Sequence, residues 1–207
     1  MANKTSKQTS RSKSALQREA RLRKQRQRKI RTIVIATVVV VGIVAAFVVA
    51  ALADRENVDG VATFDGLDRE PHTEDPVEYD QTPPVGGLHS ATPLTCGIYT
   101  TDVANENAVH SLEHGAVWIT YQPDLDEDDV TALTAFVLRQ SDATQSYLIL
   151  SPYEGQAEPI MLTAWGRQLV PDGANDPRLK EFTDTYVRGR QAPEAGSPCV
   201  GAQIPAG

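Results

Sequence analysis

The sequence predicts an α+β fold, or a small α/β sandwich, for an extracytoplasmic domain that follows one N-terminal transmembrane helix. Two observations support this: a basic segment adjoins a long apolar run, and helix and strand patterns alternate after residue 85. The formal charge of −7 hides an asymmetry, because residues 1–31 carry +11 and the rest of the chain carries −18. The two parts are therefore suited to different environments.

The apolar run from Thr32 to Ala53 contains no charged residue over its 22 positions. Such a run forms about 33 Å of helix, which is enough to cross a hydrocarbon core of about 30 Å. Basic residues stay on the cytoplasmic side of a membrane. We therefore expect residues 1–31 to be a basic cytoplasmic tail, 32–53 a transmembrane helix of the cell membrane, and the rest of the chain to be extracytoplasmic.

Two alternatives concern these first residues. A cleaved signal peptide remains open, because the Ala50–Ala53 stretch resembles a cleavage site, although the apolar run exceeds the usual 7–15 residues. Nucleic-acid binding by the tail is disfavoured, because the tail has no aromatic side chain on which bases could stack. Membrane lipid is the expected partner, since anionic headgroups attract juxtamembrane basic segments.

Residues 54–84 are rich in acids and proline and show little periodicity, which predicts an extended linker before a domain at 85–207. The domain's hydrophobic pattern predicts the order helix–strand–helix–strand–strand–helix, and this order is typical of a small sheet covered by helices. The expected helices are 104–114, 124–139 and a last one that Asp176 caps and Pro177 opens; the expected strands are 116–121, 146–151 and 160–165.

The two cysteines, Cys96 and Cys199, form an even pair in a domain expected outside the cytoplasm. A disulfide is the simplest outcome there, and free thiols or metal ligands are the alternative. In the chain-entropy model, closing a loop of 103 residues contributes on the order of 4–5 kcal/mol.

Three of the four histidines, His89, His110 and His114, fall within 26 residues. His110 and His114 are one helical turn apart, so their rings project from the same side of the expected helix, with Glu113 close by. Such a pair can hold a transition metal, and His89 is the natural third ligand. Copper and zinc are the expected ions, because imidazole suits both; structural histidines that bind no metal are the alternative.

The order His-x-x-Glu-His is also that of inverted zinc proteases, in which Glu113 would be the general base. The short helix, the small domain and the lack of a distinct third acidic ligand argue against a hydrolase. We therefore do not expect an enzyme, and Glu113 is only a weak catalytic candidate.

Four segments carry a resemblance to a known family: Pro83–His89, Gly97–Tyr99, Val109–Tyr121 and Leu162–Arg167. Together they resemble the bacterial membrane-anchored family called domain of unknown function 3105. Its pattern has a Pro-Pro-x-Ser-Gly-x-His segment, a His-Ser-Leu-Glu-His-Gly block and an Ala-Trp-Gly block. The resemblance covers roughly residues 60–195 and departs at Gly86, where the family usually has Ser. It implies that His89, His110, Glu113 and His114 act together, but it implies no activity.

The leading expectation is thus an exported domain of unknown role that binds a transition metal through His89, His110 and His114. The first alternative is a non-catalytic accessory or scaffold subunit of an envelope protein complex, in which the histidines are structural. The metal-dependent hydrolase is the second alternative.

Overall fold

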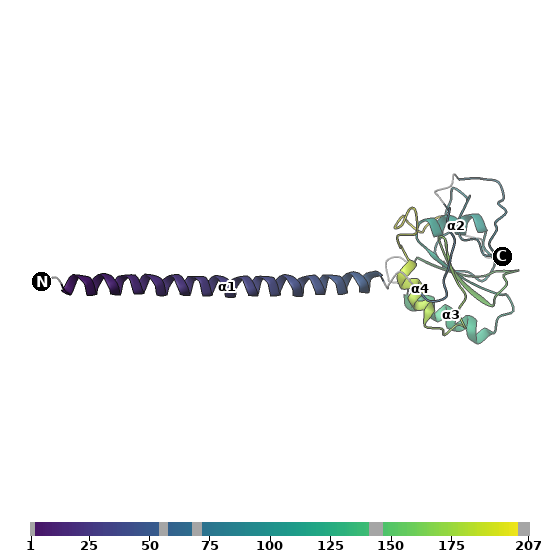
Figure 1. Cartoon of the computed structure of the whole chain (residues 1–207). Coiled ribbons are helices and arrows are strands. Elements are labelled where there is room, and N and C mark those ends of the chain that lie inside the picture. Colours follow the sequence, from purple (N-terminus) through teal and green to yellow (C-terminus); the bar gives the residue numbers. More distant parts are fainter. Residues whose placement is uncertain (1–2, 54–57, 68–71, 141–146, 203–207) are drawn as a thin grey trace. The chain divides into compact units, whose positions relative to one another are not determined.

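The computed structural model describes residues 3–53, 58–67, 72–140 and 147–202 (Figure 1). Residues 1–2 of the predicted tail, 54–57 and 68–71 of the predicted linker, and 141–146 and 203–207 of the predicted domain lie outside these ranges. The chain divides into two compact units, Met1–Asp54 and Arg55–Gly207.

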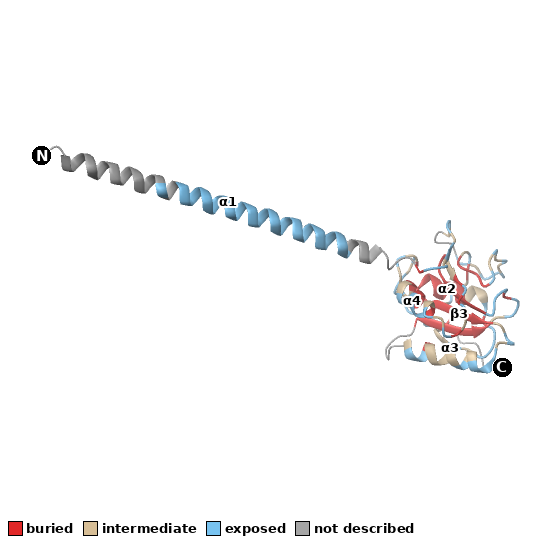
Figure 2. Ribbon diagram, turned by 60° about the horizontal axis from the view of Figure 1, so that its bottom comes forward, coloured by how far each residue is buried: buried red, intermediate tan, exposed pale blue. Residues whose placement is uncertain are grey.

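The first unit consists of one continuous helix, α1 (Asn3–Ala53). Within it, the segment Arg21–Val48 is long and apolar enough to cross a membrane. The side chains of this segment are all exposed, so its Val, Ile and Phe residues are not covered by protein (Figure 2). The structure therefore confirms one N-terminal apolar helix suited to a membrane span.

The second unit is built on a mixed six-stranded sheet with the strand order β1-β6-β5-β3-β4-β2. Central β3 pairs in parallel with β4 and antiparallel with β5, while edge strand β2 pairs in parallel with β4. The strands are β1 (Ala62–Thr63), β2 (Gly97–Ile98), β3 (Val117–Tyr121), β4 (Leu148–Pro152), β5 (Ile160–Ala164) and β6 (Arg167–Leu169).

Helices cover both faces of this sheet, which is why β3, β4 and β5 are buried along their whole length. On one face, side chains such as Ile119 and Leu162 pack with α3 (Glu127–Gln140) and α4 (Arg178–Tyr186). On the other face, Trp118 and Ile149 pack with α2 (Asn105–Glu113). The alternation follows from the two-residue period of a strand. The predicted α+β class is therefore confirmed.

Helix α2 ends at a turn that only glycine can make at position 115. Gly115 has φ +94°, and an added Cβ would lie 2.7 Å from the Cα of Arg188. Its amide donates to the carbonyl of Leu112, and the next amide, of Ala116, donates to Ser111. The chain thus reverses from α2 directly into β3, so that the end of α2 stands over the sheet.

The sequence pattern did not predict three short strands, β1, β2 and β6. Strand β1 lies in the segment 54–84, which was expected to be a linker, and pairs with β6. Val58, in the same segment, packs into the core. At the other end of the domain, α4 begins one residue later than expected, at Arg178, although a carboxylate oxygen of Asp176 does accept the Arg178 amide at 2.8 Å.

Candidate metal site

All four histidines of the chain, His72, His89, His110 and His114, lie in one group, which we call the histidine cluster. The ring centroids of His72, His89 and His110 are each 5.0 Å from the other two. The ring of His114 is 4.5 Å from that of His110.

Three segments of the chain bring these rings together. His110 lies in the last turn of α2 and His114 is its C-cap residue, so the two rings are one turn apart. His89 precedes α2, and the neighbouring Ser90 amide donates to the carbonyl of Glu106 in α2. His72 pairs with His89 in a parallel bridge, in which the Thr73 amide donates to the His89 carbonyl at 2.8 Å.

Three of the rings have their Nδ1 atoms held by backbone carbonyl oxygens. The pairs are His89 with Gly87 at 2.8 Å, His110 with Ser90 at 2.6 Å, and His114 with Pro198 at 2.8 Å. A carbonyl oxygen can only accept, so each Nδ1 carries the proton and donates it. In a neutral ring, Nε2 then presents an unprotonated lone pair. The backbone thereby fixes the tautomer and the orientation of all three rings.

The Nε2 atoms point toward one another and toward carboxylates. The Nε2 atoms of His110 and His114 are 2.9 Å apart. Nε2 of His89 lies 3.1 Å from Oε2 of Glu113, and Nε2 of His114 lies 3.6 Å from Oε2 of Glu194. Lone pairs and carboxylate oxygens thus converge at the centre of the cluster, and this arrangement favours a bound cation or an added proton.

Burial disfavours protonation of the His110 ring. The His110 side chain is 5% exposed, and its pKa is lowered to about 4; burial is the main cause, the neighbouring histidines add to the shift, and the hydrogen bond to Ser90 opposes it. His89 and Glu113 are also buried, whereas His72 is exposed. At neutral pH the His110 ring is therefore uncharged, and the cluster reaches solvent on the His72 side.

The geometry of part of the cluster could accommodate a metal ion. Ligand atoms of His72, His89 and His110 all lie within 4.8 Å of one another, so these three histidines could hold an ion. Tetrahedral ligands at about 2.0–2.1 Å from zinc are roughly 3.3 Å apart, which is shorter than this 4.8 Å limit, so zinc would draw the ligand atoms closer together. Imidazoles that donate their other N–H to a backbone carbonyl are typical of metal sites. The donors are nitrogen and oxygen, because both cysteines are joined to each other.

The segment before His89 packs against a tryptophan beside the cluster. The Trp165 ring meets the His89 ring edge-on at 6.0 Å, and the Gly166 amide donates to the Val85 carbonyl at 2.7 Å. Gly86 has φ +151°, and a Cβ there would lie 3.3 Å from the Trp165 ring. This backbone therefore favours the glycine that stands where the resemblance predicts serine.

The structure contains the disulfide between Cys96 and Cys199, with a Cα–Cα distance of 5.5 Å. The bond ties the C-terminal segment to residues that pack on α2: Leu94 donates its amide to Asn107 and accepts from the Ser111 hydroxyl at 2.7 Å. Helix α2 therefore binds the segment next to Cys96 and also positions His110 and, at its C-cap, His114.

Of the predicted site residues, His89 and His110 belong to the three histidines that could hold an ion, whereas Glu113 and His114 lie beside His89 and His110, respectively. The structure adds His72, which sequence reasoning placed in a linker, and Glu194 and Pro198, to which sequence reasoning assigned no role. His72 could have been found by its residue type, since it is the one remaining histidine of the chain. For Glu194 and Pro198 the sequence offered no comparable signal.

A family model described as "Protein of unknown function (DUF3105)" matches residues 72–201. The matched region contains all four histidines, both cysteines and Glu194. No curated protein and no solved structure matches the chain.

Proposed function

Because this chain belongs to the family described as "Protein of unknown function (DUF3105)", whose description assigns no activity, we propose a function from the site itself. The protein is a membrane-anchored, exported metal-binding protein, and its histidine cluster holds one divalent transition ion. Copper and zinc are the candidate ions, because the donors are imidazoles and carboxylates.

One observation carries this proposal: the Nε2 atoms of His110 and His114 face each other at 2.9 Å while both Nδ1 protons are donated to carbonyl oxygens. Two opposed lone pairs repel unless a cation lies between or beside them. A proton could serve, but the lowered pKa of His110, about 4, works against it at neutral pH. A metal ion satisfies both nitrogens, and the neighbouring carboxylates lower the net charge of the bound state.

The anchor and the disulfide support the cellular part of the proposal. A helix long enough to span a membrane precedes the domain, and a disulfide is stable in oxidising compartments outside the cytoplasm. The basic tail then lies on the cytoplasmic side, where anionic lipids neutralise it. The exported domain would meet metal ions in the envelope rather than in the cytoplasm.

The test is metal stoichiometry of the full chain, purified in detergent, stripped with a chelator and reloaded with zinc or copper. We expect one tightly bound ion per chain by elemental analysis after removal of free metal. The control is a double variant, His110→Asn with His114→Asn, which keeps polar side chains but removes both ring donors. Absence of stoichiometric metal from the wild type, or equal metal in the variant, would contradict the proposal and leave an accessory role in an envelope complex.

A metal-dependent hydrolase receives less support from the same geometry. Glu113 would have to act on a metal-bound water, but its side chain is 2% exposed and its Oε2 lies 3.1 Å from His89. Such a carboxylate is better placed to orient a ligand than to reach a substrate.

A further inference from the structure

We infer that residues 192–199, which we call the C-terminal strap, complete the metal site: the strap supplies Glu194 as an oxygen ligand and fixes His114, and the Cys96–Cys199 disulfide holds it there. This inference rests on the proposed function. It makes metal affinity depend on a bond that lies outside the cluster itself.

The strap is joined to the end of α2 by its backbone. The Glu194 amide donates to the carbonyl of Glu113, and the Gly196 amide donates to the carbonyl of His114, both at 3.0 Å. The last carbonyls of a helix lack partners within the helix, so the strap satisfies two of them. The strap is therefore held in a fixed position relative to Glu113 and His114.

Two groups of the strap reach the ring of His114 from opposite sides. The Pro198 carbonyl accepts the Nδ1 proton at 2.8 Å, while Oε2 of Glu194 lies 3.6 Å from Nε2. That second distance is too long for a hydrogen bond, but it is close to the roughly 3.3 Å that separates two ligands of one tetrahedral ion. Glu194 thus stands where an oxygen ligand belongs, and Pro198 holds the ring in the matching orientation.

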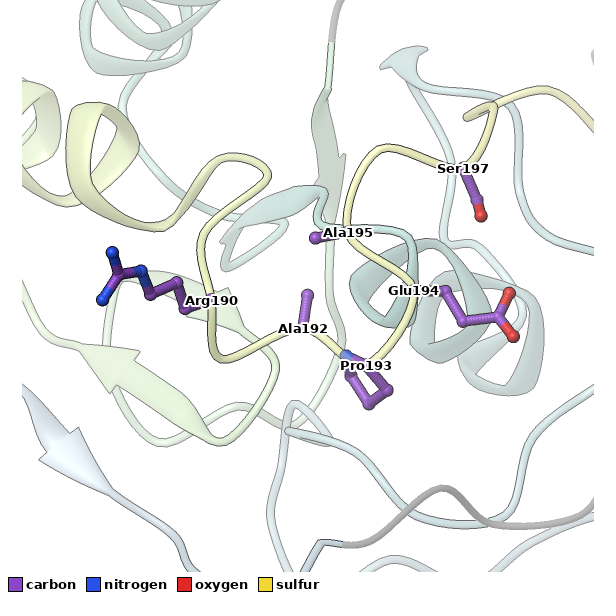
Figure 3. Close-up of a pocket in the computed structure, with 6 residues that line it drawn as sticks. All are labelled: Arg190, Ala192, Pro193, Glu194, Ala195 and Ser197. Atoms are coloured by element: carbon purple, nitrogen blue, oxygen red, sulfur yellow. The ribbon is translucent and has the colours of Figure 1, made fainter.

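The pocket on this part of the molecule is formed by the strap and the residues just before it. This open hollow, of about 560 Å³, is lined by Arg190, Ala192, Pro193, Glu194, Ala195 and Ser197 (Figure 3). Figure 3 shows the Arg190 and Glu194 side chains extending in opposite directions from the loop. Glu194 retains 33% exposure, so it reaches the cluster while remaining accessible to solvent.

The disulfide fixes the end of the strap, one residue after the Pro198 carbonyl that accepts from His114. Cys199 directly follows Pro198, and the Cys96 amide donates to the Cys199 carbonyl at 3.1 Å. Without the bond, the Tyr147 hydroxyl, which lies 3.2 Å from the Gly196 carbonyl and 3.0 Å from that of Ser197, would still hold the strap's middle. The Pro198 carbonyl would be less well fixed, so affinity should fall without the domain losing its fold.

The experiment measures zinc affinity of the full chain in detergent by competition with a chromophoric chelator, and records the visible spectrum of the cobalt-substituted protein. We expect Glu194→Gln to weaken zinc binding about 10-fold to 100-fold and to change the cobalt spectrum, because an oxygen ligand changes. The matched control is Glu181→Gln, on α4 at the opposite face of the sheet, which should change neither.

The double variant Cys96→Ser with Cys199→Ser tests the disulfide, at a temperature where circular dichroism shows it folded. We expect a loss of affinity of about 10-fold, the lower end of the effect of removing an orienting partner. If wild type binds no zinc, the proposed function fails. If wild type binds zinc but Glu194→Gln matches Glu181→Gln in affinity and spectrum, this inference alone is overturned, even where the serine variant does not fold.

Discussion

The Nε2 atoms of His110 and His114 lie 2.9 Å apart, while a backbone carbonyl oxygen holds the opposite nitrogen of each ring. Neither ring can turn away without losing its hydrogen bond. The carbonyls come from different parts of the chain, Ser90 before α2 and Pro198 near the disulfide. The domain therefore holds two electron-rich atoms face to face, and this arrangement is the basis of the predictions about the cluster.

The four histidines should contribute unequally to metal affinity. Single changes of His89, His110 or His114 to Ala should each weaken zinc binding sharply, and a second change should add little, because ligands of one ion act as a unit. His72→Ala should cost less, because His72 is exposed and its segment is held to the cluster by one bridge. Calorimetric titration of stripped protein measures this; wild-type affinity in all four variants would exclude the cluster as the site.

Glu113→Gln should separate an orienting role from a catalytic one. The carboxylate lies 3.1 Å from Nε2 of His89 in a buried position, so its neutral amide should weaken metal binding by roughly 10-fold or more. Competition with a chelator measures the change. A variant that binds metal as tightly as wild type would exclude the orienting role; a general base in a hydrolase would spare binding and abolish turnover.

The Cys96–Cys199 bond should be present in protein recovered from the membrane. No thiol should react with an alkylating agent under denaturing, non-reducing conditions, whereas two should react after reduction. Replacing both cysteines by serine should lower the free energy of unfolding by about 2–5 kcal/mol, because the unfolded chain is then no longer cross-linked. Denaturant unfolding of both proteins checks this, and two reactive thiols without reduction would contradict it.

The basic segment beside the apolar helix should set the orientation of the chain. A reporter enzyme that works only outside the cytoplasm, fused after Gly207, should be active. An N-terminal tag should resist protease added to intact cells and become cleavable once the membrane is opened. Finding both ends in the cytoplasm would refute the membrane topology.

Acid should remove the contribution of Asp176 to stability. The hydrogen bond from the Arg178 side chain lowers the Asp176 pKa from 3.8 to about 2, and its carboxylate also accepts the Arg178 and Asp172 amides. Its folded pKa lies below its unfolded value, so the stabilisation is present above pH 3.8 and lost as pH falls toward 2.

Asp176→Asn should therefore destabilise the domain by about 1 kcal/mol at pH 7, and the difference from wild type should disappear as pH falls below about 2. Urea unfolding at several pH values measures it. The control is Asp184→Asn, which removes an exposed ion pair with Lys180 and should have little effect. A pH-independent difference would show that Asp176 acts through packing rather than charge.

The sequence predicted the elements that have a clear period or a long buried run. Helix α3 and strands β3, β4 and β5 follow from apolar stripes and continuous buried segments. Strands β1 and β2 have only two residues each, which is too short to show any period, and they exist because neighbouring strands offer free backbone groups.

The candidate site was predictable only where its residues are close in sequence. His110 and His114 share a helix turn, and His89 lies shortly before it. His72 contacts the cluster through a bridge between two irregular segments, and Pro198 reaches His114 across 84 residues. Such contacts depend on how the whole chain packs, and no local pattern encodes them.

The separation between His114 and Pro198 also bears on the order of folding. The parallel pair β3–β4 and the antiparallel pair β3–β5 join segments of moderate separation, whereas the cluster needs residues from position 72 to position 198. Contacts between distant residues form late, because the entropy of loop closure must first be overcome. A partly folded chain would thus have its central strands β3, β4 and β5 before its full set of donors, and would capture an ion only near the end of folding.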